Sequence, residues 1–453
     1  MATTPRHKLN VGVVGTGFPK FNHALGKAYF DEIARLVDCS FAEPSIIEDL
    51  VMDDSACAEA IRILSAEKAD VLIVVSATFS YGGYIVNMAR GLRGIPFVLW
   101  GLPEPEEPSG RIQLNSLCGA NVNSSFLKRL GVYYKFILGR PCDERASREL
   151  NEFLRAAWVR KQMENSRICL VGNRAPGFYL SNVDELRLRR QIGPELVHLS
   201  LSTLIAGARA QDEADVHLEM SRMTGEVQSI TATSAMLNKT ARMNLFLRQH
   251  ADANGIDGYA IKCWPELQEE YDCSICAAIS RLNAEGIPTA CEGDIGGLVT
   301  MMIMHYLTGS SVALLDLVNV IPESGVLELW HCGGVAHDLA GDRECSGYCT
   351  HPTMGESIGA ATSFAIRSGP ATCARLSELG DGYRIFVFEA QAEEVPVNYC
   401  GNTMRVRPQM SAGDLVRAMV YEGVEHHYAV AHDHIGSVLA EYAKLSGMSG
   451  CRY

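Results

Sequence analysis

The sequence predicts an α/β protein in which two doubly wound α/β domains precede a β-rich C-terminal domain. Three observations predict this class. Strand and helix signals alternate through the first 100 residues, the alternation restarts near residue 167, and after residue 333 Gly, Thr and Ser become frequent while the apolar runs shorten. Alternating strands and helices are typical of parallel sheets covered by helices. We therefore expect an N-terminal domain at 1–163, a central domain at 164–330 and a C-terminal domain at 331–453.

The first predicted domain alternates short apolar runs with amphipathic segments. Its run 69–75, ADVLIVV, is apolar throughout, as in a strand buried on both faces of a parallel sheet. Gly15 and Gly17 follow the first strand, but Lys20 stands where a dinucleotide-binding fingerprint needs a third glycine. A plain strand-to-helix turn explains the two glycines better. We expect strands at 9–14, 69–75 and 96–100, and helices at 22–36, 56–66 and 84–92.

The later domains are marked by a restart of this rhythm and then by its loss. A polar helix at 143–164 ends the first domain, and a strand at 168–171 opens the second. Strand and helix signals then alternate to about residue 320. In the third domain we expect mostly strands, among them 427–431, until a last helix near 436–445.

Composition and charge exclude several classes of protein. The 453 residues are 47% hydrophobic and 21% charged, which is ordinary for a globular chain and unlike a disordered one. The formal net charge of −13 argues against nucleic acid as a partner, because phosphate binding needs clustered Lys and Arg. The most apolar run, 295–307, is shorter than the roughly 20 residues that span a bilayer, so no membrane segment is expected.

The 15 cysteines bear on the cellular compartment. Their number is odd and most lie inside apolar runs, which indicates free thiols in a reducing cytoplasm. Cys273 and Cys276 have the spacing of half a zinc ribbon, but no second pair with this spacing follows. Both also fit the apolar face of a helix, and we prefer that interpretation.

Carboxylates mark the segment 287–320. Glu292 and Asp294 end an apolar strand just before Gly296 and Gly297 open a helix, and we expect Asp294 to cap that helix. Asp316 lies inside the apolar run VALLDLV. A buried carboxylate costs several kcal/mol unless it is paired or binds a metal. Asp316 therefore pairs with a core Arg or Lys, points outward from its strand end, or takes part in chemistry, because α/β folds place their sites at strand ends.

Histidines gather near the C-terminus. Seven of the 13 follow residue 330, and they include the pair His426 and His427 and the nearby His432 and His434. Imidazole together with carboxylate suits Mn, Fe or Zn rather than Ca. Each histidine alone can equally be structural, so these residues are candidates rather than assigned ligands.

The segments with carboxylates and histidines resemble the L-fucose/L-arabinose isomerase family of metal-dependent aldose–ketose isomerases. The resemblance is strongest over 259–334. The matching features are the run Cys263-Trp264-Pro265-Glu266, then Glu292, the motif HYLTG at 305–309, Asp316, the run Glu425-His426-His427, and His434-Ile435-Gly436. This chain is shorter than the fucose-type enzymes, so the substrate contacts of their N-terminal region cannot be transferred to it.

The resemblance implies a role for each residue at a matching position. Glu292, Asp316 and His427 are the implied ligands of a divalent metal, for which we expect Mn²⁺; Glu292, Asp316 and Glu266 are the implied catalytic carboxylates; Trp264, His331 and His434 are the implied sugar-pocket residues, with His434 as the alternative metal ligand. The resemblance also implies a monosaccharide substrate and a homo-oligomer with active sites near subunit interfaces.

The chemistry of sugar isomerisation explains this set of residues. A proton moves between C1 and C2 through a cis-enediol, a carboxylate carries it, and a divalent metal stabilises the negative charge that develops on the sugar oxygens. We therefore expect an enzyme that interconverts an aldose and a ketose. Three alternatives remain: an enzyme of the same fold that acts on a modified or acidic sugar, a non-enzymatic sugar-binding protein, and a nucleotide-dependent enzyme.

Overall fold

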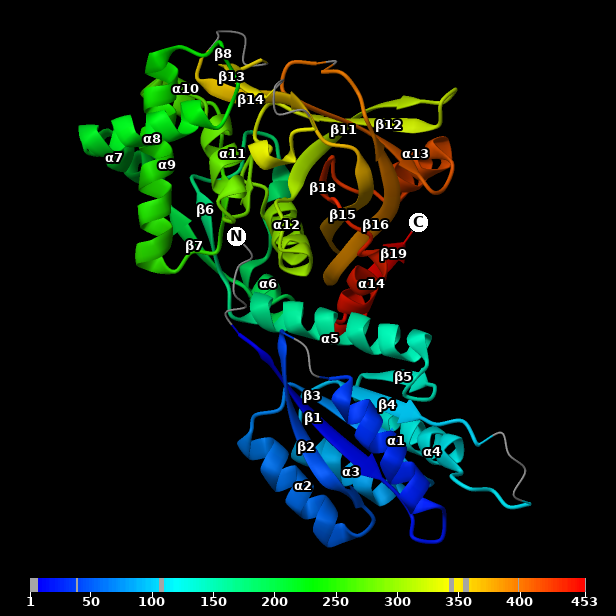
Figure 1. The fold of residues 1–453 in the computed structure, drawn as a ribbon. Coiled ribbons are helices and arrows are strands. Elements are labelled where there is room, and N and C mark those ends of the chain that lie inside the picture. Colours follow the sequence, from blue (N-terminus) through cyan, green and yellow to red (C-terminus); the bar gives the residue numbers. More distant parts are fainter. Residues whose placement is uncertain are drawn as a thin grey trace. The chain divides into compact units, whose positions relative to one another are not determined.

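The computed structural model describes residues 7–37, 40–105, 110–341, 346–352, 358–397 and 399–452, and all side chains of these except those of 451 and 452. The chain divides into two compact units, which we call the N-terminal unit (Thr4–Lys161) and the C-terminal unit (Gln162–Tyr453). Figure 1 shows the elements of each unit in sequence colours.

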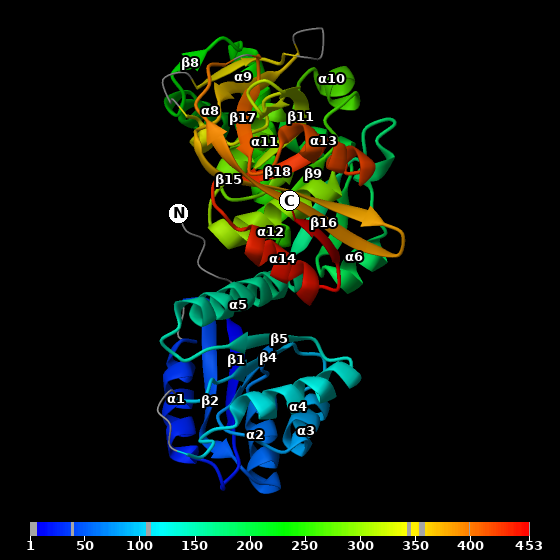
Figure 2. The same cartoon turned by 90° about the vertical axis from the view of Figure 1, so that its right-hand side faces the viewer.

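The N-terminal unit contains a five-stranded parallel sheet with strand order β2-β1-β3-β4-β5. Helix α1 lies on one side of this sheet, and α2, α3 and α4 lie on the other (Figure 2). The strands are β1 (Leu9–Thr16), β2 (Ala42–Val51), β3 (Val71–Ser76), β4 (Phe97–Gly101) and β5 (Tyr134–Leu138), and the helices are α1 (His23–Arg35), α2 (Asp54–Ala66), α3 (Gly82–Gly91), α4 (Ser116–Arg129) and α5 (Glu144–Glu164).

Alternation along β1 explains how helices cover both faces of this sheet. Val14 belongs to the apolar core shared with α2, α3 and α4. Its neighbour Gly15 faces the opposite way, since a Cβ added there would lie 2.9 Å from a ring carbon of Phe30 in α1. The predicted strand–helix rhythm is confirmed, but β2 was not predicted. The reason is that β2 is an edge strand whose charged and polar residues hide its apolar pattern.

The C-terminal unit begins with a four-stranded parallel sheet with strand order β10-β9-β6-β7. Loops that follow its strands carry several of the site residues described below. The strands are β6 (Arg167–Val171), β7 (Glu195–Leu199), β9 (Gly258–Ile261) and β10 (Thr289–Ala290), and the helices are α6 (Glu185–Gln191), α7 (Leu201–Arg209), α8 (Glu213–Gly225), α9 (Ser234–Asn254), α10 (Glu266–Tyr271), α11 (Cys276–Ala284) and α12 (Ile295–Thr308). In the described part of the chain, no helix is both long and apolar enough to cross a membrane.

A second, ten-stranded sheet makes the rest of this unit β-rich, as predicted. Strand β16 pairs with both β15 and β17, which closes six strands into a barrel in the order β16-β15-β18-β11-β12-β17. The strands are β8 (Ser229–Ile230), β11 (Ala313–Ile321), β12 (Val326–His331), β13 (Gly347–Thr350), β14 (Ala360–Ala365), β15 (Gly369–Leu379), β16 (Gly382–Glu393), β17 (Asn402–Pro408), β18 (His427–Ala431) and β19 (Ser449–Arg452), with helices α13 (Ala412–Tyr421) and α14 (Gly436–Leu445).

The barrel encloses an apolar core that includes Leu315, Leu329, Phe386, Phe388 and Met404. Helix α12 packs against two of its strands, β15 and β18. Helix α13 was not predicted, because we expected mostly strands between residue 333 and the last helix near 436–445. The barrel includes β11 and therefore begins before residue 330. The predicted boundary between the central and C-terminal domains, at 330/331, falls within β12. The division of the chain into three domains stays a prediction.

Candidate active site

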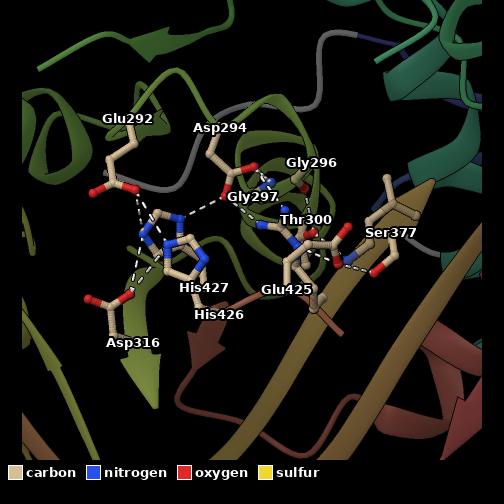
Figure 3. A network of polar contacts seen from close by, with 12 residues as sticks. Glu292, Asp294, Gly296, Gly297, Thr300, Asp316, Ser377, Glu425, His426 and His427 are labelled. Atoms are coloured by element: carbon tan, nitrogen blue, oxygen red, sulfur yellow. Dashed lines mark hydrogen bonds and ion pairs between the residues drawn. The ribbon is translucent and has the colours of Figure 1, made fainter. Parts of the chain in front are cut away.

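Strand pairing brings an aspartate and a histidine together on the outside of the barrel. Asp316 of β11 and His427 of β18 are direct partners in an antiparallel pair. Their neighbours Leu315 and Tyr428 belong to the barrel core, so Asp316 and His427 face outward. Glu292, from the loop after β10, meets them there (Figure 3). His427 Nε2 lies 3.4 Å from Asp316 Oδ1 and 3.6 Å from Glu292 Oε2.

The loop that carries Glu292 has an unusual backbone. Glu292 has a φ of +62°, in the left-handed region that non-glycine residues rarely adopt. The next residue, Gly293, also has a positive φ, and a Cβ added to it would lie only 2.4 Å from the carbonyl oxygen of Asn173. The loop is thus pressed against the segment after β6. Strain of this kind is typical of residues held for a function.

Asp294 makes three contacts at the start of α12. Its Oδ1 accepts a hydrogen bond from the backbone N–H of Gly297 at 2.9 Å, so it caps the helix as expected. Its two oxygens also accept hydrogen bonds from the buried Arg375 guanidinium, at 2.5 and 3.0 Å. Its third partner is His427, whose Nδ1 lies 2.8 Å from Oδ2. The expected cap is confirmed, and the contacts with Arg375 and His427 are additional to it.

These contacts decide which nitrogen of His427 carries a proton. Burial raises the pKa of Asp294, but Arg375 and His427 more than offset this effect and hold that pKa well below its usual range. An ionised carboxylate only accepts hydrogen bonds, so Nδ1 of His427 must be the donor. Its other nitrogen, Nε2, faces Glu292 and Asp316 and offers a lone pair when the ring is neutral. A carboxylate behind an imidazole is the arrangement that orients histidine ligands of metals.

Two glycines make room for the buried ion pair. A Cβ on Gly297 would lie 2.4 Å from Asp294 Oδ2, and one on Gly296 would lie 2.9 Å from the carbonyl oxygen of Leu376. Both distances are shorter than real Cβ contacts. The pair Gly296-Gly297 thus allows the first turn of α12 to approach β15 closely enough for Arg375 to reach Asp294.

Further polar contacts join α12 and the segment before β18 to β15. The backbone N–H of Leu376 donates to Thr300 Oγ1 at 2.9 Å. Arg375 Nε lies 3.4 Å from Glu425 Oε2, and Ser377 donates a hydrogen bond to the same carboxylate. The side chain of Arg375 is therefore bracketed by carboxylates from two segments far apart in the chain.

The imidazoles lie in negatively charged surroundings. His426 Nε2 lies 3.4 Å from Glu292 Oε2 and 4.0 Å from Asp316 Oδ1, and the hydrogen bond to Glu292 raises the pKa of His426. Burial lowers the pKa of His331, but Cys332, Asp316 and Glu292 raise it to about 10. The carboxylates thus favour positive charge at this position, which a bound cation would also supply.

The residues at this position fit a divalent metal ion. Asp316 Oδ1 and His427 Nε2 are buried, and neither makes a hydrogen bond within the described part of the chain. A cation between them and Glu292 would satisfy both atoms, and carboxylate with imidazole suits first-row metals. Two groups of three residues have ligand atoms that all lie within 4.8 Å of one another inside the group. The first group is Asp316, His331 and His427, and the second is Glu292, His426 and His427.

Two other predicted residues lie near the loop after β9. Glu266 opens α10 and forms an ion pair with Lys262; burial raises the pKa of Glu266, but Lys262 lowers it below its ordinary value. Trp264 packs edge-on against Phe178, with ring centroids 6.2 Å apart. Phe178 in turn lies 5.5 Å from the ring of His426. Trp264 is thus connected to the site through one aromatic side chain.

His434, the alternative metal ligand, lies elsewhere. Its Nδ1 is 3.9 Å from Glu389 Oε2, and about half of its side chain is exposed. His427 is almost fully buried and faces both carboxylates. The geometry therefore brings His427 rather than His434 to Glu292 and Asp316.

Two hollows lie at the site, one beside Asp294 and His426 and the other beside Glu292 and Asp316. One is a cleft of about 300 Å³ and the other a smaller cavity of about 100 Å³. The cleft is lined by Gly177, Phe178, Tyr179, Leu180, Ser181, Asp294, Arg375, Glu425 and His426. The cavity is lined by Cys263, Gln268, Ser274, Cys276, Glu292, Asp316, Trp330, His331, Cys332 and His351.

Sequence reasoning missed the supporting residues. Glu425 and His426 belong to the matching run Glu425-His426-His427, but no role was assigned to either of them. Asp294 was expected to cap the helix, and its two other contacts were not expected. Arg375 carries a signal that could have found it, since a charged residue inside the strand ATCARL needs a buried partner. Phe178 offers no such signal, because aromatic residues are common in any core.

Comparison with known proteins adds a separate line of evidence. No protein-family model matches the chain. The chain is 29% identical over 377 residues to a sulfoquinovose isomerase of Alkalicoccus urumqiensis, covering 83% of this chain and 84% of that protein. It is 26% identical over 443 residues to a sulfoquinovose isomerase of Clostridium sp. (strain MSTE9), covering 97% of each. An L-arabinose isomerase 1 of Bacillus licheniformis is 22% identical over 343 residues, covering 71% of this chain and 66% of that protein.

We expect Arg375→Met to destabilise the C-terminal unit by about 3–5 kcal/mol, because it leaves the Asp294 carboxylate buried without its main counter-charge. Arg417→Met is the matched control. It removes an exposed ion pair with Asp414, so its effect should stay within about 1 kcal/mol. Urea unfolding of the full chain measures both values. Equal losses for the two variants would contradict the importance of the buried pair.

Proposed function

The chain belongs to the L-fucose/L-arabinose isomerase-like family and is an aldose–ketose isomerase, and from this premise we propose that its substrate is a hexose with an anionic group at C6. Sulfoquinovose is such a sugar, with a sulfonate in place of the C6 hydroxyl. The observation that carries this proposal is the extent of the similarity. The sulfoquinovose isomerases match 83% and 97% of the chain, whereas the L-arabinose isomerase matches 71% at lower identity.

We assign the proton transfer to the two carboxylates that face His427. One of them, through Glu292 Oε2 or Asp316 Oδ1, removes the proton from C2 of the aldose and returns it to C1 on the same face of the enediol. The oxygens lie on either side of His427 Nε2, at 3.6 and 3.4 Å, which supports a shared binding point for the sugar's O1 and O2. We propose that His426, whose Nε2 lies beside Glu292, contacts the sugar from the open side.

We propose that Glu292, Asp316 and His427 hold a divalent cation, and that the cation is Mn²⁺. When bound, such an ion stabilises the negative charge that develops on the sugar oxygens during proton transfer. The unsatisfied Asp316 Oδ1 and His427 Nε2 support this assignment. The role of Asp294 is to keep the His427 lone pair directed at the site, and the role of Arg375 is to keep Asp294 ionised.

The cleft of about 300 Å³ is the proposed place of the sugar chain beyond C2, since a hexose fits that volume. Phe178 and Tyr179 give it an aromatic wall. Arg174 lies over the Tyr179 ring, with 4.4 Å between the guanidinium carbon and the ring centroid. We propose Arg174 as the cation that meets the sulfonate.

Three of the remaining residues keep the roles first expected of them: Trp264 and His331 as proposed sugar-pocket residues, and Glu266 as a proposed catalytic carboxylate. His434 is proposed only as a peripheral contact.

Three broader expectations are also proposals. We propose that the N-terminal unit is a doubly wound α/β domain, because helices lie on both faces of its parallel sheet. We propose a cytoplasmic location, because the described cysteines are all free thiols, as in a reducing compartment. We also propose a homo-oligomer, because α4 and the edge strand β5 expose the apolar side chains of Leu117, Phe126, Phe136 and Leu138.

The substrate proposal is tested by assaying sulfoquinovose, glucose, L-fucose and L-arabinose, each with and without added Mn²⁺. We expect sulfoquinovose to give the highest kcat/KM, and turnover to fall after chelation. Arg174→Met should raise KM for sulfoquinovose about tenfold or more and leave KM for glucose unchanged, because the lost charge-assisted contact is worth about 1.5–3 kcal/mol. Equal use of glucose and sulfoquinovose by the unmodified protein would contradict the anionic substrate.

The proposed carboxylates are tested by Glu292→Gln and Asp316→Asn. Each should lower kcat by about 10²–10⁴-fold, the loss typical of a missing general base, and should weaken Mn²⁺ binding measured by calorimetry. Asp414→Asn is the surface control and should retain full activity, since its carboxylate is exposed. An active Asp316→Asn enzyme with unchanged metal affinity would show that Asp316 has been assigned wrongly.

The oligomer is tested by light scattering of the full chain. We expect a mass that is a multiple of 49.4 kDa, and a lower mass for Phe136→Glu, which places a charge in the apolar patch. Leu186→Glu, at an exposed leucine of α6, is the control and should leave the mass unchanged. A fully active monomer would refute the oligomer, and an unchanged mass for Phe136→Glu would refute this patch as its interface.

A further inference from the structure

A cluster of sulfur and nitrogen atoms lies beside the carboxylates and has no role in the proposed reaction. Cys276 begins α11, Cys332 follows β12, and His351 follows β13. Their ligand atoms all lie within 4.8 Å of one another. Cys291, directly after β10, is within hydrogen-bonding reach of both Cys276 and Cys332. Residues that are far apart in the sequence thus bring two thiols and an imidazole together, with the thiol of Cys291 next to both sulfurs.

The distances match a metal site. The sulfur atoms of Cys276 and Cys332 are 3.6 Å apart. Two thiolates bound to one tetrahedral zinc at about 2.3 Å would lie about 3.7 Å apart. Three thiols with one histidine are also a donor set found in structural zinc sites. Cys273 is not part of the cluster, so this site differs from the half zinc ribbon that the spacing of Cys273 and Cys276 resembles.

The cluster also has access to solvent and room for an ion. Cys276, Cys332 and His351 line the cavity of about 100 Å³ that also reaches Glu292 and Asp316. Cys332 is only partly buried. Inert packing of thiols as small apolar groups would fill this space rather than leave a cavity lined by sulfur and nitrogen. Thiolate ligands select thiophilic cations over Mn²⁺.

We infer that Cys276, Cys332 and His351, with Cys291 as the fourth donor, form a second metal site for a thiophilic d¹⁰ cation such as Zn²⁺. On binding, the thiol protons pass to solvent and metal–sulfur bonds replace the S–H bonds. His331 lies between the two sites: its Nδ1 is 3.4 Å from Cys332 Sγ, and its ring is 5.5 Å from that of His427. An ion among the thiols would therefore lie one side chain away from the catalytic carboxylates.

The test adds Cd²⁺ to the metal-free full chain and follows ultraviolet absorption. Bonds between Cd²⁺ and thiolate absorb there, whereas bonds to carboxylate and imidazole do not. We expect an absorption that saturates at one equivalent, and we expect Cys276→Ser and Cys332→Ser each to remove at least about half of it. Cys118→Ser, an exposed cysteine of the N-terminal unit, and Asp316→Asn should retain it, which separates this site from the proposed catalytic one.

A second measurement covers the case in which a buried cysteine variant fails to fold. The unmodified protein is alkylated with and without Cd²⁺, and each cysteine is read by mass spectrometry. Slower alkylation of Cys276 and Cys332 in the presence of Cd²⁺ supports the site. The inference is overturned if Cd²⁺ produces no thiolate absorption, if the folded Cys276→Ser and Cys332→Ser variants keep it, or if neither cysteine is protected.

Discussion

The buried carboxylate of Asp294 is the constraint on which the rest of the site depends. It joins three parts of the C-terminal unit: the first turn of α12 through Gly297, strand β15 through Arg375, and strand β18 through His427. Moving these charges out of water is costly, and the cost is recovered only when all the hydrogen bonds form together. The barrel, the helix and the histidine are therefore compatible with one arrangement and not with a slightly shifted one.

The same carboxylate links stability to chemistry. Because Asp294 stays ionised, His427 must donate from Nδ1, and its Nε2 faces Glu292 and Asp316. A glycine pair at the start of the helix is what permits this contact, since a side chain at either position would collide with the ion pair or with β15. The two glycines that the sequence marks as a helix start thus have a second role in the geometry of the site.

Much of the fold followed from local patterns, whereas the site followed only in part. Apolar runs and amphipathic segments predicted most strands and helices, but the polar edge strand β2 was missed. Glu292 and Asp316 could be found because each interrupts apolar sequence. The pairing of Asp294 with Arg375 and His427 could not be found, because these residues lie 81 and 133 positions away and no local pattern records such pairing. The thiol cluster escaped notice for the same reason, since each cysteine sits in its own apolar run.

Two sets of side chains of different character line one cavity. Glu292 and Asp316 offer carboxylate oxygens, which are hard donors, whereas Cys276 and Cys332 offer sulfur, which is soft, and the imidazole of His331 lies beside Cys332. In the two proposed metal sites, selectivity between cations would come from donor type, without a change in the shape of the protein.

The position of β18 within the barrel has a consequence for biosynthesis. This strand lies between β15 and β11, although both precede it in the chain. At about 5–20 residues per second, the roughly 100 residues between β11 and β18 take about 5–20 s to be made. During that interval β11 has an open edge, and β15 has one from the time it is made until β18 arrives; such edges invite pairing with other chains. The nascent protein is thus most exposed to aggregation just before its last strands arrive, and a chaperone that shields these edges would raise the yield of folded enzyme.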